Sequence, residues 1–279
     1  MRSVIARGGF GLPEFVVALA LTAVLAAVLV QLLVRQAWVA RAQQESALRQ
    51  EAVRAGGFFL PAELRDLGGP EPGGDLLAGG PDSIVYRATR GLGTACGLGP
   101  TGLLLEDSTL SGYRSPQPGR DSLLLFVDGN PALISDDRWV ALPILGTAPA
   151  SCGGASALFV ATALDTSQVP LSAVPLPAPV RVFEIMEIRS YLSSGDWWLG
   201  ARSVSAGEAV QPVLGPLETG GLTLRYLDSV GAVTPAPQAT RVTVRLLIRS
   251  LLPVRWGGGV GNFRNQVDSM EIQIWPRNR

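Results

Sequence analysis

The sequence of 279 residues contains no histidine and no lysine, so all 23 of its basic residues are arginine. Without histidine there is no His general base, no Ser-His or Cys-His pair and no His-ligated metal site. Without lysine there is neither a P-loop nor a Schiff-base nucleophile. We therefore expect a protein that is not an enzyme. One enzymatic alternative is left open, a membrane-anchored hydrolase using carboxylates, for which no acid pair has a recognisable context.

Cysteine is also scarce, because only Cys96 and Cys152 occur. Two widely separated cysteines cannot form a zinc site unaided. If this region lies outside the cytoplasm, a disulfide is expected, with a loop-closure stabilisation of about 4 kcal/mol. The alternative is two unrelated buried thiols. Asp136-Asp137 and Asp228 form no spaced calcium loop, so we expect turn acids, no metal and no cofactor.

The formal charge is balanced, with 23 acids against 23 arginines. Residues 41–279 carry 20 arginines and 22 acids, a net charge of −2, and the arginines do not cluster. Phosphate binding needs several converging cations. The sequence therefore predicts no direct DNA binding.

A long apolar run lies near the start of the chain. Phe15 to Val34 is interrupted only by Thr22 and Gln31. At 1.5 Å per residue a helix of this length spans about 30 Å, which is the thickness of a bilayer's hydrocarbon core. Secretory signal peptides usually have a shorter apolar stretch. The run predicts a continuous transmembrane helix.

Arginines on both sides leave the orientation of this helix undecided. Arg2 and Arg7 precede the run, whereas Arg35 and Arg41 follow it. Positive residues favour the cytoplasmic side. The large following domain, with its expected disulfide, decides for a cytoplasmic leader and an external domain.

An acid stands at the edge of the apolar run. Glu14 follows Pro13, and both residue types suit the first turn of a helix, the proline for its fixed φ and the acid for the helix dipole. Neither property explains the preceding residues. Gly9-Phe10-Gly11-Leu12-Pro13-Glu14, followed by about 20 apolar residues, resembles the class III leader of type IV pilins and type II secretion pseudopilins.

The resemblance implies a processing site and an assembly residue. In that family a prepilin peptidase cuts after the glycine, here Gly9, and methylates the new amino terminus, here Phe10. Glu14 is then the fifth mature residue and pairs with the amino terminus of a neighbouring subunit inside the filament. Gly11 and Pro13 depart mildly from the family's pattern. The alternative interpretation is a plain single-pass anchor with an acid at its edge.

Helix formers continue beyond the membrane run, until Gly56-Gly57 and Pro61 are expected to weaken or kink the helix. A glycine- and proline-rich loop over 62–83 follows, and alternating segments then predict strands. We expect a hairpin of "DSLLLFVDGN" with "RWVALPIL", and further strands in "DSIVYRAT", "ALFVATAL", "PVRVFEIMEIRSYLS", "GLTLRYLDSVGAV", "RVTVRLLIRS" and "DSMEIQIW".

These segments predict an α+β fold, a long helix packed on a mostly antiparallel β domain. The helix has a transmembrane half and an amphipathic half, as in pilin-like proteins. The expected organisation is a leader (1–9), a transmembrane or filament-core helix (10–34), its amphipathic continuation (35–66) and a β-rich extracytoplasmic domain (67–279).

The C-terminal half is similar to the GspJ/PulJ–PilW group of minor pseudopilins and minor pilins. Leu222, Tyr226, Asp228 and Gly231 fit that group's "L-x-x-x-Y-x-D-x-x-G" segment, and Leu199 and Arg202 fit its "L-x-R"-like element loosely.

The resemblance implies a minor pilin or pseudopilin of a type IV pilus or type II secretion filament. It implies a subunit in the bacterial inner membrane that primes assembly or lies at the filament tip, and it leaves a role in DNA uptake (natural transformation) open. The implied partners are the prepilin peptidase and methyltransferase, other minor pilins, the major pilin and the inner-membrane assembly platform. The alternative is a pilus-tip receptor for DNA or a surface ligand.

Overall fold

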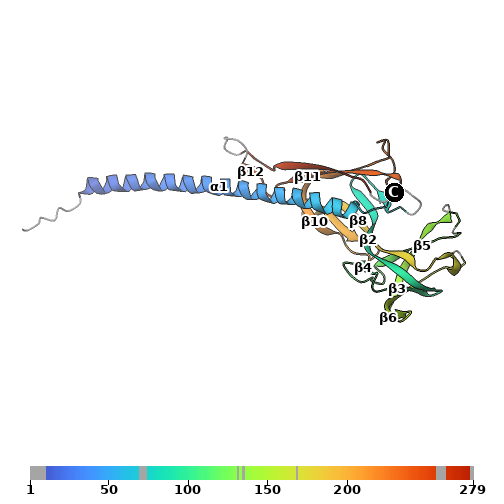
Figure 1. Cartoon of the computed structure of the whole chain (residues 1–279). Helices are drawn as coiled ribbons and strands as arrows, with labels where there is room; N and C mark the ends of the chain where they lie inside the picture. The colour runs from blue at the N-terminus through green and yellow to red at the C-terminus, as the bar shows by residue number, and fades with distance from the viewer. Residues whose placement is uncertain are drawn as a thin grey trace, which may run out of the picture. The chain divides into compact units, whose positions relative to one another are not determined.

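The computed structural model describes residues 11–68, 74–130, 132–133, 136–167, 169–255 and 262–276. One long helix, α1 (Leu12–Leu64), precedes a series of antiparallel strands, which confirms the expected α+β class (Figure 1). The chain divides into two compact units. One comprises the described residues of Met1–Arg49 and Ser250–Gln266, and the other those of Gln50–Arg249 and Val267–Arg279.

Helix α1 continues past the residues expected to weaken it. Pro61 lies in its last turn, where few backbone hydrogen bonds follow, and the Pro61 carbonyl still accepts one from the Arg65 N–H at 3.0 Å. Gly56 allows a close approach to the sheet. A Cβ there would lie only 3.0 Å from Leu246 Cδ1 and 3.0 Å from Met270 Cε.

The strands follow α1 in sequence and pair antiparallel throughout the described chain. Their bounds are β1 (Leu76–Gly79), β2 (Ser83–Gly99), β3 (Gly102–Glu106), β4 (Ser111–Gly112), β5 (Asp121–Val127), β6 (Arg138–Cys152), β7 (Ala155–Thr162), β8 (Ala178–Ser193), β9 (Asp196–Ser203), β10 (Gln211–Leu227), β11 (Arg241–Arg249), β12 (Val254–Arg255), β13 (Phe263–Arg264) and β14 (Val267–Ile274).

Part of the sheet closes into a barrel. The ladder runs β2, β3, β7, β6, β5 and β8, and β8 pairs back to β2. Alternate residues of these strands point inward, because successive side chains of a strand face opposite sides. The barrel core is formed by Ala95, Leu103, Leu105, Leu123, Leu125, Val127, Leu142, Ile144, Val160, Leu164, Val169, Val174, Ala178, Val180 and Val182.

The remaining ladder forms an open sheet in the order β1, β2, β8, β9, β10, β11 and β14. A second core lies between one face of this sheet and the C-terminal end of α1, where Leu60 and Leu64 are fully buried. Strands β2 and β8 belong to both the barrel and the open sheet. Strands β2, β8 and β10 lie near the C-terminal end of the helix in Figure 1.

The sequence located most strands, and the expected hairpin forms as β5 paired with β6. Its connection runs over 128–137, so Asp128-Gly129 does not make a two-residue turn. The loop expected over 62–83 contains β1, and β3 was not predicted. The glycine-rich stretch 256–261 lies outside the described residues.

Candidate functional site

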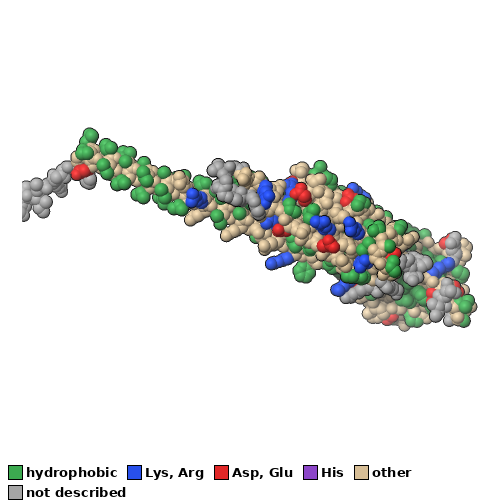
Figure 2. Space-filling view, turned by 90° about the horizontal axis from the view of Figure 1, so that it is seen from above, with side chains coloured by type: hydrophobic (Ala, Val, Ile, Leu, Met, Phe, Trp, Pro, Cys, Tyr) green, Lys and Arg blue, Asp and Glu red, His purple; other side chains and the backbone are tan. Residues whose placement is uncertain are grey.

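The first part of α1 presents an apolar surface without packing partners. Its large hydrophobic side chains are exposed from Leu12, at 81%, to Val34, at 49%. Within the described chain, α1 is the one helix long and apolar enough to cross a membrane, and none of its most apolar window is buried. Figure 2 shows hydrophobic side chains along the visible face of this segment.

Glu14 lies in the first turn of that helix and is exposed. Its Oε2 accepts a hydrogen bond from the Gly11 backbone N–H at 2.9 Å. The Gly11 carbonyl in turn accepts the first helical hydrogen bond, from the Phe15 N–H at 3.2 Å. A glutamate that reaches back to the N–H of the capping residue is half of a capping box, so Glu14 fixes the start of the helix. The expected cleavage and methylation residues, Gly9 and Phe10, lie outside the described residues.

The expected disulfide is present between Cys96 on β2 and Cys152 at the end of β6. Their Cα atoms lie 6.3 Å apart. In the ladder these two strands are separated by β3 and β7, so the bridge joins non-neighbouring strands of the barrel. Since the cysteines are 56 positions apart, the bridge closes a large loop in the unfolded chain and so lowers the conformational entropy of the unfolded state.

A buried pair of carboxylates closes one end of the barrel core. Asp121 and Glu184 lie directly opposite each other on β5 and β8, and both side chains have no exposed surface. Each continues the inward-facing row of its strand, beside Leu123 and Val182. Like charges directly opposite in a ladder repel each other. The pair therefore requires nearby cations.

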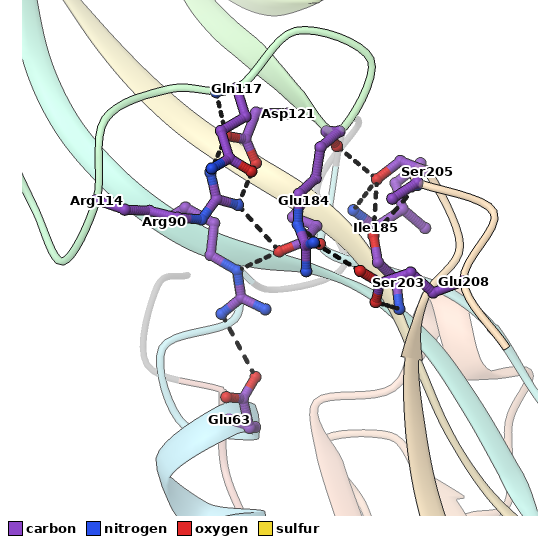
Figure 3. Close-up of polar contacts among 12 residues, drawn as sticks. Glu63, Arg90, Arg114, Gln117, Asp121, Glu184, Ile185, Ser203, Ser205 and Glu208 are labelled. Atoms are coloured by element: carbon purple, nitrogen blue, oxygen red, sulfur yellow. Dashed lines mark hydrogen bonds and ion pairs between the residues drawn. The ribbon is translucent and has the colours of Figure 1, made fainter. Parts of the chain in front are cut away.

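Three arginines supply that charge (Figure 3). Arg90 Nε donates to Glu184 Oε2 at 2.8 Å, and Arg120 Nε lies 2.6 Å from Glu184 Oε1. Arg114 binds Asp121 with both terminal nitrogens and also reaches Glu184 Oε2 at 3.3 Å. One guanidinium thus bridges the two acids, and each arginine is mostly buried, since the most exposed, Arg120, retains 32% of its side-chain surface.

A bulge in β2 aims Arg90 at Glu184. The register shifts between Thr89 and Gly91, so the intervening residue leaves the normal alternation. Arg90 Nη1 also lies 3.8 Å from Glu63 near the end of α1. The buried Tyr86 hydroxyl donates to Glu63 Oε2 at 2.9 Å, and burial together with the Glu63 charge raises the pKa of Tyr86 well above its usual value. The network thus connects α1, the open sheet and the barrel.

The Glu184 carboxylate is held in its ionised form. Burial acts to raise its pKa, but the Ser203 hydroxyl and the Arg90 and Arg120 guanidinium groups more than offset this, so the pKa is lowered. A buried, ion-paired carboxylate of this kind is deprotonated near neutral pH and has no proton to donate. The sequence analysis did not identify Glu184, although a charged residue among the inward-facing apolar positions of a strand is a recognisable signal.

The residues of the "L-x-x-x-Y-x-D-x-x-G" segment have structural roles. Leu222 is in the second core, and the Tyr226 hydroxyl donates to the Ser83 carbonyl at 2.8 Å. The Asp228 carboxylate accepts backbone N–H bonds from two following residues, at 3.0 and 2.8 Å. Gly231 completes that turn with a φ of 89°, a conformation that favours glycine. The segment therefore ends β10 and begins the return to β11.

The residues of the "L-x-R"-like element, Leu199 and Arg202, also have structural roles. Leu199 on β9 is fully buried in the second core. Arg202 forms an ion pair with Glu187 on the neighbouring strand β8. Both residues are thus explained by packing within the sheet.

Comparisons with protein-family models, curated proteins and solved structures find no match to this chain. Across the residues that the structure describes, no three His, Cys, Asp or Glu side chains gather in a way that could hold a metal ion. The strongest candidate site is therefore the exposed apolar helix surface and the acid at its start.

Proposed function

We propose that the chain is a minor pilin or pseudopilin, a subunit of a type IV pilus or a type II secretion filament. One observation carries the proposal. A single helix begins with an acid in its first turn, exposes more than 20 residues of apolar surface and ends among the buried side chains of a β domain. The leader Gly9-Phe10 stands at the family's distance from that acid.

The exposed apolar helix suggests two successive environments for this segment. A bare surface of this kind is not stable in water, because it leaves apolar area hydrated at a cost of about 25 cal/mol per Å². We propose that the bilayer covers it first, in a single-pass protein of the bacterial inner membrane with its β domain outside. The packed helices of other minor subunits and the major pilin cover it after assembly. The disulfide fits an oxidising compartment.

In this proposal Glu14 has two tasks. Before assembly it caps its own helix through Gly11, which holds the carboxylate at a fixed place. After the prepilin peptidase has cut between Gly9 and Phe10, the methylated amino terminus of a neighbour pairs with it. Neither charge is stable alone in an apolar medium, so a subunit in the wrong register is penalised.

The cleavage step is tested by mass. The full chain is co-expressed in cells with a prepilin peptidase, and the mature protein is measured intact. The expected product begins at a methylated Phe10. Gly9→Trp should abolish processing, whereas Gly8→Ala, one residue further from the cut, should leave it unchanged. A Gly9→Trp protein with the same mature mass as the wild type would refute the site.

The assembly step needs a separate readout. Glu14→Ala should still be inserted in the membrane and cleaved, but its recovery with the other filament subunits should fall. Glu14→Asp, which keeps the charge, serves as the matched control and should retain part of this recovery. Equal recovery of the alanine variant and the wild type would refute the ion-pair role of Glu14.

A further inference from the structure

A short hairpin between β11 and β14 lies against the helix just beyond its apolar run. The hairpin consists of β12 and β13, paired through Val254 with Arg264 and Arg255 with Phe263. Its base is closed by the Ser250 N–H, which donates to the Gln266 carbonyl at 2.8 Å. Both the hairpin and the helix up to Arg49 belong to one compact unit of the structure.

Two contacts fix the direction of the hairpin along the helix. The Leu252 N–H donates to the buried Glu45 carboxylate at 3.3 Å, and the Phe263 ring contacts the Trp38 ring with centroids 4.8 Å apart. Trp38 precedes Glu45 by seven positions, which is about 10 Å along the axis. The hairpin therefore runs from its base toward the apolar end of the helix.

The Trp38–Phe263 pair lies at the depth of lipid headgroups if the apolar run spans a bilayer. Trp38 follows Val34, the last residue of the run, by four positions, or about 6 Å. The headgroup layer on each side of the hydrocarbon core is about 5–7 Å thick. Aromatic side chains concentrate in this layer because one part of the ring is apolar and the other polar.

The surface beside this pair has the composition of a membrane-facing element. Leu251, Leu252 and Phe263 keep 48%, 43% and 41% of their surface exposed. Within 250–266 the sequence has two arginines and no acid, and on the neighbouring part of the helix Arg35 and Arg41 are exposed. Each arginine near an anionic membrane surface adds an attraction of about 1 kcal/mol.

We infer that the described part of the β12–β13 hairpin, residues 250–255 and 262–266, docks on the lipid surface beside the transmembrane helix and prefers anionic headgroups. The apolar side chains of Leu251, Leu252 and Phe263 enter the interface, while Arg35 and Arg41 of the helix contact lipid phosphate. Because the helix and this hairpin surface both contact the membrane, the unit that they form cannot rotate freely about the helix axis. This inference needs only membrane anchoring and does not depend on filament membership.

Photocrosslinking of the full chain in vesicles tests the inference. The photoreactive p-benzoylphenylalanine replaces Phe263 in one variant and Leu251 in a second, and Val230, an 86% exposed residue of the other unit, in the matched control. The vesicles contain phosphatidylcholine alone or with phosphatidylglycerol. Lipid adducts are measured by mass spectrometry, and an intact Cys96–Cys152 bridge verifies the fold.

We expect several-fold more lipid adduct at 263 and 251 than at 230, and a further increase with the anionic lipid. Replacing Arg35 and Arg41 by glutamine should reduce that increase. Equal yields at 263 and 230 would overturn the inference, as would adducts of 263 with a second copy of the chain in place of lipid. Because the vesicles hold no peptidase and no other subunit, this result is independent of the test of the proposed function.

Discussion

Replacing Glu184 by glutamine should destabilise the protein by about 3 kcal/mol. Removing one partner from a buried charge network typically costs about 3–5 kcal/mol, because the opposite charges remain buried. Here each guanidinium keeps a second acid, which places the cost at the lower end. Arg90 keeps Glu63, Arg114 keeps Asp121, and Arg120 keeps Glu208.

Glu208→Gln is the matched control. It removes the other acid that pairs with Arg120, but its side chain is 39% exposed, and ion pairs at this exposure contribute at most about 1 kcal/mol. The assay is thermal unfolding of the full chain in detergent with the disulfide intact. For a unit of this size, about 3 kcal/mol corresponds to a fall in Tm of about 6–12 °C. Equal shifts for the two variants would refute the argument that burial decides the cost.

The same carboxylate should also set part of the acid stability. The pKa of Glu184 in the folded protein is below its ordinary value of 4.5, so the unfolded chain binds more protons between these two values. Its contribution is therefore complete above about pH 4.5 and is lost as the pH falls through the folded-state pKa. The wild type should be more stable than Glu184→Gln by a constant margin above about pH 4.5, and the two stability profiles should converge as the pH falls below it; a margin unchanged through the acid range would contradict the assignment.

Two further predictions concern the disulfide and the helix contact. Cys96→Ser together with Cys152→Ser should lower the free energy of unfolding by about 4 kcal/mol, and non-reducing peptide mass analysis of the wild type should recover the two cysteines joined. Gly57→Ala should stabilise the protein by up to about 1 kcal/mol, because an added Cβ meets only ordinary contact at 3.5 Å, while Gly56→Val should destabilise it by about 1–3 kcal/mol against Leu246. Chemical denaturation checks both, and equal effects at the two glycines would contradict the close helix contact.

The elements could be predicted because their signals are local. The alternation in "DSLLLFV" shows directly which residues face inward, and Leu123, Leu125 and Val127 do so. The closure of the barrel could not be predicted in this way. It depends on β8 pairing with both β2 and β5, a choice of partner and register that no single segment encodes.

The two candidate sites also differ in whether their residues are close together in the sequence. Glu14 could be proposed from the sequence because the argument rests on its distance from Gly9 and from the apolar run, all within one short stretch. The buried network was missed because Arg90, Arg114 and Asp121 meet Glu184 only after folding. The β2 bulge that aims Arg90 is itself a consequence of pairing.

Glu184 and Glu14 show how differently a carboxylate can be satisfied. Glu184 receives three guanidinium groups and a hydroxyl from within its own domain. Glu14 receives one backbone N–H and, among the residues that the structure describes, no cation. A capping hydrogen bond satisfies a donor of the helix but leaves the negative charge uncompensated, which an apolar medium penalises heavily. If the helix functions in such a medium, the missing cation comes from outside the described chain. In the proposed function, that cation is the amino terminus that cleavage before Phe10 would create on a neighbouring subunit, whereas in a plain membrane anchor Glu14 would serve the helix start alone.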